Sequence, residues 1–278
     1  MNVTELKKTA NNIRKGIIEE VHAAKSGHPG GSLSAADILT YLYFEEMKNI
    51  DPKDPQNPDR DRFVLSKGHA APVLYATLAE KGFFPKEELL TLRRIGSRLQ
   101  GHPDMNLLPG VDMSTGSLGQ GFSTAVGMAL AAKLDQKDYR VYALAGDGEI
   151  QEGQIWEACM FAGHRKLDNL VLIVDNNGLQ IDGEIKKVCS PYPLDEKFMS
   201  FNFNVVHADA HDFDSLAEAF RQAREMKGMP TAIVAKSVKG KGVSFMENEA
   251  GWHGKGPNDE EYKTAMEDLE RIETELCQ

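Results

Sequence analysis

The sequence predicts an α/β protein with a doubly wound, mostly parallel sheet flanked by helices. Short apolar runs of strand length alternate with segments of helical periodicity, a pattern typical of parallel sheets. The five runs cover residues 62–66, 141–145, 170–175, 204–209 and 231–236. Two polar clusters, at 146–149 and 176–179, directly follow the second and third runs. Ligands bind at the carboxyl ends of the strands in this fold class, so the clusters indicate a ligand site.

The intervening segments predict the helices and loops. Apolar positions at helical spacing indicate helices over residues 4–24, 34–47, 72–81, 122–134, 214–226 and 258–276, with a further helical stretch led by Pro85. Gly127, inside one of them, is expected to mark close packing. Residues 26–32 read as a rigid glycine-rich turn, and loops are expected over residues 97–118, 181–197 and 237–257. A loop as long as 97–118 indicates a function beyond connecting two elements.

Composition excludes several classes of protein. The 278 residues include 32 Lys and Arg against 42 Asp and Glu, a formal net charge of −10, with no basic run typical of nucleic-acid binding. The cysteines, Cys159, Cys189 and Cys277, are widely spaced, which favours a reducing compartment; Cys159 is expected to be a small buried apolar residue. The N-terminus lacks a signal-peptide core, and no apolar run approaches the ~18 residues of a membrane span. We therefore expect a cytoplasmic protein that binds neither nucleic acid nor membrane.

The two polar clusters have the chemistry of a cation and phosphate site. Asp147 and Asn177 offer oxygen ligands to a hard cation such as Mg²⁺, which can in turn hold a phosphate. Glycines beside Asp147 allow the backbone to approach that phosphate, and Glu149 is expected to open a helix whose N-terminus favours anions. No linker, repeat or low-complexity tract interrupts the chain, so a single domain over residues 1–278 is expected.

Histidines in glycine-flanked loops form a second set of candidates. His28, His69, His102 and His253 each lie in such a loop. Histidine can move protons or hydrogen-bond a polar substrate near neutral pH. A single one reads most simply as a loop residue bonded to backbone, but four argue for function. They lack the spacing of local metal ligands.

Taken in order, these motifs resemble the transketolase family of thiamine-diphosphate enzymes. The matching segments are SGHPG at 26–30, KGHA at 67–70, GHPD at 101–104, TGSLGQG at 115–121, GDGEIQEG at 146–153, NN at 176–177, KGKG at 239–242 and WHGK at 252–255. Each motif alone is weak. Together, in family order and over nearly the whole chain, they are specific.

The resemblance implies thiamine diphosphate as cofactor, held through Mg²⁺ or Ca²⁺. It implies metal ligation by Asp147, Asn177 and the backbone carbonyl of Leu179. It implies cofactor contacts, from diphosphate to aminopyrimidine, by His69, Gly116, Ser117, Leu118, Gly148, Glu152, Asn177, Lys67 and Lys239. It implies a substrate channel lined by His28, His69, His102 and His253, which would bind sugar hydroxyls and move protons.

Simpler structural roles remain open for several of these residues. Asp147 could cap the helix that follows it, and Asn177 could be a left-handed turn residue. Glu152 could be a solvated helix carboxylate, and Lys67 and Lys239 could be ordinary exposed lysines.

The resemblance covers only the first part of a full-length transketolase. The pyrimidine-binding and C-terminal domains, with the glutamate that acts on the aminopyrimidine and most of the arginines for the sugar phosphate, are absent. We therefore expect the N-terminal half of a two-chain enzyme, which works with a C-terminal partner subunit in an α₂β₂ assembly. It would transfer a two-carbon ketol unit between ketose and aldose phosphates in pentose phosphate metabolism.

Alternatives to this expectation remain. The chain could be an excised domain of a longer enzyme, or a split transketolase for an unusual or branched sugar phosphate. Rivals with the same cofactor are a deoxyxylulose-phosphate synthase and a 2-oxo-acid dehydrogenase α-subunit. A non-catalytic scaffold is the rival from another class.

Overall fold

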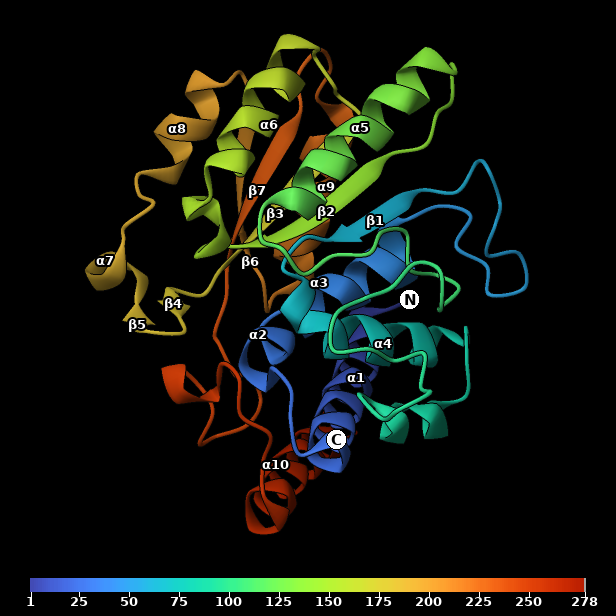
Figure 1. Cartoon of the computed structure of the whole chain (residues 1–278), viewed down its shortest axis with the longest axis vertical. Coiled ribbons are helices and arrows are strands. Elements are labelled where there is room, and N and C mark those ends of the chain that lie inside the picture. Colours follow the sequence, from blue (N-terminus) through green and yellow to red (C-terminus); the bar gives the residue numbers. More distant parts are fainter. Residues whose placement is uncertain (278) are drawn as a thin grey trace.

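The computed structural model, which describes residues 1–277, confirms the predicted fold class (Figure 1). A five-stranded sheet has the order β1-β2-β3-β7-β6, and every neighbouring pair in it is parallel. Its strands are β1 (Arg62–Leu65), β2 (Val141–Gly146), β3 (Leu170–Asn176), β6 (Asn204–Asp209) and β7 (Thr231–Lys236). All five apolar runs are therefore strands. Gly146 is in register with Asp175, so both polar clusters leave the sheet at the same edge.

Helices cover both faces of the sheet. One face carries α5 (Gln120–Leu134), α6 (Gly153–His164) and α8 (Leu194–Ser200), as Figure 1 shows. The other carries α1 (Val3–Ala24), α3 (Ala36–Tyr41), α4 (Ala71–Lys81), α9 (Phe213–Glu225) and α10 (Asp259–Leu276). Successive side chains of a strand enter opposite cores: Phe63 and Leu65 pack on one side and Val64 on the other. Burial on both faces explains why the strands are continuous apolar runs.

The predicted turn and loops contain short elements that the sequence pattern did not reveal. Residues 26–32 include the helix α2 (Pro29–Leu33), for which Pro29 supplies the preset φ of a first helical position. The helix expected over 34–47 ends as α3 and continues as a π-helical turn, Leu42–Glu46. Residues 181–197, expected to be a loop, hold β5 (Gly183–Glu184), α7 (Ile185–Val188) and the start of α8; β5 pairs with β4 (Leu179–Gln180). Turns of 3₁₀ helix lie at Gly68–Ala70, Lys86–Thr91, Glu149–Gln151 and Ala250–Trp252.

A buried ionic network joins three elements behind the sheet edge. Arg14 of α1 donates to Asp37 of α3, and His211 Nδ1 lies 2.7 Å from the same carboxylate. The backbone N–H of Val238 donates to His211 Nε2 at 2.9 Å, so the proton of the neutral ring is on Nδ1 and is donated to Asp37. Burial alone would raise the pKa of Asp37, but Arg14 and His211 lower it to about 2. The network thereby anchors the segment that carries Lys239.

Two helical glycines have opposite environments. Gly163 of α6 is buried, and a Cβ there would overlap the carbonyl oxygen of Phe201. Gly127 of α5 is exposed and has no atom within 4 Å of a Cβ position, so the expectation that it marks close packing is wrong within this chain.

Gly163→Ala is expected to lower the free energy of unfolding by about 1–3 kcal/mol, because the helix must move away from the backbone of Phe201. Gly127→Ala is the matched control. It is expected to raise that free energy by up to about 1 kcal/mol through helix propensity alone. Urea unfolding of the purified chain measures both, and equal stabilities for the two variants would contradict the packing argument.

Cys159 is fully buried, as predicted. Within residues 1–277, none of the helices combines the length and the apolar character needed to cross a membrane.

Candidate active site

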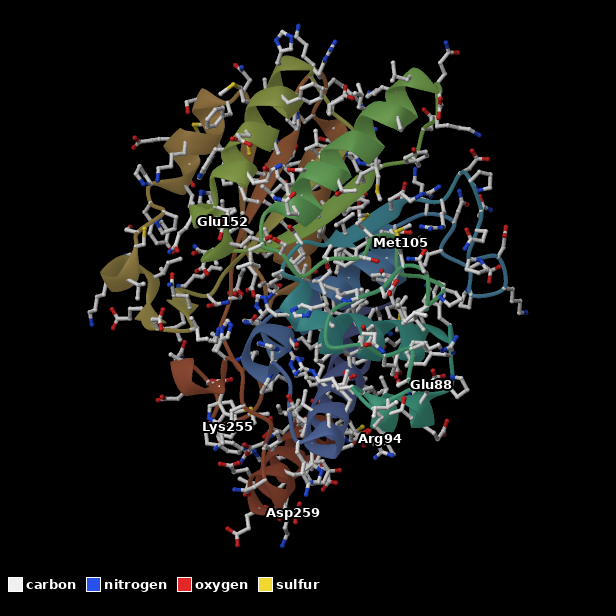
Figure 2. The ribbon with its side chains drawn as sticks, viewed as in Figure 1. Glu88, Arg94, Met105, Glu152, Lys255 and Asp259 are labelled. Carbon is white, nitrogen blue, oxygen red and sulfur yellow. The ribbon has the colours of Figure 1, made fainter. Side chains whose placement is uncertain are left out.

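A cavity of about 280 Å³ opens at the carboxyl edge of the sheet. Most of the residues singled out by the sequence line it: Lys67, His69, Gly116, Leu118, Asp147, Gly148, Glu152, Asn177, Leu179, Lys239 and His253. They come from loops far apart in the sequence, brought together because β1, β2, β3 and β7 all end at this edge. Glu152 is exposed at the start of α6 and forms part of the outer wall (Figure 2).

Three predicted residues lie outside the cavity wall. The His28 ring is centred 5.2 Å from that of His69 and 5.4 Å from that of His253, so it belongs to the same cluster of rings. His102 is exposed and packs on Gly116, where a Cβ would lie 3.1 Å from its ring. Ser117 is exposed.

Asp147 is a buried carboxylate held by backbone amides. Gly148 N donates to one oxygen at 2.9 Å and Gly178 N to the other at 2.6 Å. Burial, and then the nearby negative charge of Asp175, raise the pKa of Asp147 to about 7. Within the described chain no basic side chain forms an ion pair with Asp147, and neither oxygen caps a helix. Its ionised form therefore lacks a compensating cation.

Asn177 lies beside this carboxylate with its amide oriented. Its Oδ1 accepts from Leu179 N at 3.0 Å, and its Nδ2 donates to Asp175 at 3.2 Å. Gly178, at φ +77°, takes the left-handed turn position in place of Asn177. Carboxylate, amide and carbonyl oxygens are the donors that Mg²⁺ and Ca²⁺ prefer, and the donor set at Asp147 fits such a cation. Among residues 1–277, no cluster of three His, Cys, Asp or Glu offers another metal site.

Lys67 and Lys239 are buried, with 1% and 2% of their surfaces exposed, so the interpretation of ordinary exposed lysines is wrong. Lys239 Nζ lies 3.1 Å from His253 Nδ1. Burial, followed by the charge of Lys67, lowers the pKa of Lys239 to about 8. No carboxylate in the described part of the chain pairs with Lys239. A buried ammonium without a counter-charge favours the binding of an anion.

Sequence reasoning missed the partner of Lys67. Lys67 Nζ lies 2.5 Å from Asp175 Oδ2 and 2.6 Å from the carbonyl of Gly31. Ser34 donates to Asp175 at 2.6 Å, and Ser237 donates to its other oxygen. Burial alone would raise the pKa of Asp175, but Lys67 and the hydrogen bonds hold it below its usual value. An aspartate at the end of an otherwise apolar strand was the signal available.

Glu149 has a different place from the one expected. Its carboxylate is buried and accepts from Ser66 Oγ at 2.6 Å, Gly119 N at 2.8 Å and Gly146 N at 3.1 Å. The regular helix α6 begins only at Gly153. Glu149 therefore joins three loops at the cavity floor.

The histidines around the cavity are neutral at pH 7. Burial and then the charge of Arg93 lower the pKa of His28 to about 4. Burial and then Lys239 lower the pKa of His253 to about 4, and burial and then Lys67 hold the pKa of His69 well below its usual value. Neutral imidazoles can both accept and donate hydrogen bonds. The cluster therefore suits a substrate rich in hydroxyl groups.

Comparison with known proteins identifies the family. A family model described as the thiamine diphosphate binding domain of transketolase matches residues 5–271. The chain belongs to the transketolase family. The predicted cofactor, thiamine diphosphate, is confirmed at the level of this domain. The fold is that of transketolases as well: the crystal structure of the Campylobacter jejuni enzyme superposes with a TM-score of 0.90 at 36% identity, covering 97% of this chain and 43% of that one.

Two relatives have nearly the same length as this chain. The "6-deoxy-6-sulfo-D-fructose transketolase subunit SqwG" of Clostridium sp. (strain MSTE9) is 48% identical over 96% of this chain and 97% of its own. An apulose-4-phosphate transketolase subunit of Phocaeicola vulgatus is 43% identical over 98% and 97%. The chain thus spans almost all of two transketolase subunits, but less than half of the Campylobacter jejuni transketolase.

Proposed function

We propose that this chain is the diphosphate-binding subunit of a two-chain transketolase and forms one domain of that kind. A partner subunit would carry the pyrimidine-binding and C-terminal domains, in an α₂β₂ assembly in the cytoplasm. The reaction is transfer of a two-carbon ketol unit between ketose and aldose phosphates, as in pentose phosphate metabolism. The near-complete coverage of two relatives named as transketolase subunits supports the two-chain form.

One observation carries the proposal: a buried carboxylate without a cation and a buried ammonium without an anion line the same cavity. A divalent cation bound to a diphosphate supplies both missing charges. Asp147, Asn177 and the Leu179 carbonyl would hold the cation. Lys239 and Lys67 would face the phosphates.

Further contacts complete the proposed cofactor site. His69 and the backbone of Gly148 would contact the diphosphate. The backbone of Gly116, Ser117 and Leu118 would approach the aminopyrimidine, and Glu152 would belong to a carboxylate network between cofactor sites. When bound, thiamine diphosphate supplies the nucleophile that takes up the two-carbon unit.

The histidines would act on the sugar. His28, His69 and His253 have ring centres 5.1–5.4 Å apart, close enough to hydrogen-bond neighbouring hydroxyl groups of one substrate. Their lowered pKa values keep them available as proton acceptors at neutral pH. His102, on the exposed loop beside Gly116, and His253 are our candidates for proton transfer and donor recognition.

A second candidate is the same transfer on a less common sugar. The names of both full-length relatives specify such substrates, one a sulfonated ketose and the other apulose 4-phosphate. Assays should therefore include a sulfonated sugar and a branched sugar phosphate beside the common ketose phosphates.

Reconstitution tests the proposal. The purified chain is expected to show no ketol transfer alone. With a C-terminal transketolase subunit from the same source it should gain activity that requires thiamine diphosphate and a divalent cation. Robust transfer by the chain alone would overturn the two-chain form. A reconstituted complex that binds no thiamine diphosphate would overturn the function.

A further inference from the structure

An arginine outside the cavity lies between the two loops that carry His28 and His102. Arg93 Nη1 donates to Ser26 Oγ at 2.7 Å. On the other side, a Cβ built on Gly101 would lie 3.1 Å from Arg93 Nε. The guanidinium therefore touches both histidine loops, and the glycine at 101 leaves it the room to do so.

The charge of Arg93 acts on both histidines. After burial, it is the largest cause that lowers the pKa of His28. It is likewise the next cause after burial that lowers the pKa of His102. These effects agree with the contacts in placing a cation at the rim where the two loops meet.

The backbone fixes the direction of this side chain. Arg93 has φ +60°, in the left-handed region, and its N–H donates to the carbonyl of Leu99 at 2.9 Å. The loop between them is thus closed on itself. A non-glycine residue held at positive φ is uncommon, and such a conformation persists only where surrounding contacts maintain it.

Arg93 has no carboxylate partner within residues 1–277, whereas Arg98 of the same segment makes a two-point contact with Glu88 at 2.6 and 2.9 Å. Ser26 is the one side chain in the described structure that accepts from Arg93, which uses one of five N–H donors. An exposed guanidinium with donors to spare, on a chain of net charge −10, is suited to an oxyanion.

We propose that Arg93 binds the terminal oxyanion, a phosphate or sulfonate, of the sugar and so contributes to specificity for anionic substrates. The proposal rests on the proposed function. In that function the histidines bind hydroxyl groups of the sugar, with Lys67 and Lys239 committed to the cofactor end. Arg93 is exposed and His28 is partly buried, so the substrate's far end would reach Arg93 as it leaves the cavity. A planar guanidinium donates two parallel hydrogen bonds to such a group.

The test compares two donors that differ in charge but share the reacting end. Steady-state kinetics of the reconstituted complex would use fructose 6-phosphate and the uncharged L-erythrulose. Arg93→Gln is expected to raise KM for the phosphorylated donor by about tenfold to a hundredfold, the range of a lost charge-assisted contact. KM and kcat for erythrulose, and KM for thiamine diphosphate, should stay as in the wild type.

Arg94→Gln is the matched control, since it removes the same charge from the next residue. Arg94 is also exposed, and Figure 2 shows it beside Glu88, far from Glu152 at the cavity wall. It is expected to leave both donors unaffected. Arg93→Lys, which keeps the charge and loses the fork, should give a smaller rise for the phosphorylated donor and serves if Arg93→Gln fails to fold.

Specific outcomes would overturn the inference. Equal changes for both donors would make Arg93 a general positioning residue, and no change for either would remove it from recognition. A raised KM for thiamine diphosphate alone would assign it to the cofactor. A wild-type complex that transfers from neither donor would instead contradict the proposed function.

Discussion

Asp147→Asn is expected to abolish cofactor-dependent activity of the reconstituted enzyme and to leave the chain folded. The substitution removes the one carboxylate of the proposed cation site, while the amide keeps an oxygen for one of the two backbone donors, Gly148 N or Gly178 N. Affinity for thiamine diphosphate in the presence of Mg²⁺ should fall by at least about a hundredfold, since loss of even an outer-shell partner of a metal ligand costs tenfold to a hundredfold.

Calorimetric titration of the complex with the cofactor and Mg²⁺ measures this effect. Asp182→Asn is the matched control: Asp182 is exposed on the turn between β4 and β5, next to Ile181 of the cavity wall, and loses the same charge. It should bind the cofactor as the wild type does. Retained affinity in Asp147→Asn would remove Asp147 from the cation site.

Asp37→Asn is expected to lower the free energy of unfolding by about 3–5 kcal/mol, the usual effect of removing one partner from a buried ion pair. Arg14, 7% exposed, would keep its charge without a carboxylate, and the proton of His211 Nδ1 would lose a charged acceptor. Denaturant unfolding of the wild type and the variant measures the difference.

The difference should depend on pH in a definite direction. Because the pKa of Asp37 in the folded chain, about 2, is below its ordinary value of 3.8, its stabilisation is complete above about pH 4. It is lost as the pH falls through 2. Glu218→Gln, which breaks an exposed pair with Arg221, is the control and should leave the midpoint nearly unchanged because water screens that pair. A similar midpoint for both variants would contradict a stabilising role for the buried network.

The parts of the fold that repeat a local pattern could be predicted from the sequence. Each strand is a run of apolar residues because both of its faces are buried, and that run is visible without knowledge of its neighbours. Asp147 and Asn177 were likewise predictable as neighbours, since each directly follows a strand and parallel strands end together.

Contacts between distant segments could not be predicted in this way. Lys67 and Asp175 are 108 residues apart, and no local pattern says that a lysine after one strand reaches an aspartate at the end of another. Arg93 and Arg94 are equivalent in sequence, and only the left-handed backbone at Arg93 separates the residue that turns to the histidine loops from the one that does not. The short helix α2 was hidden because its glycines read as a turn.

The three hydrogen bonds to Glu149 have a consequence for the thermodynamics of cofactor binding. They join the ends of β1 and β2 to the loop before α5, so the backbone that faces the cofactor is already ordered in the folded chain. Ordering a residue costs about 1–2 kcal/mol in conformational entropy, and here that cost belongs to folding. Association with the cofactor can then proceed with little further loss of chain entropy, which favours tight binding by a pre-organised surface.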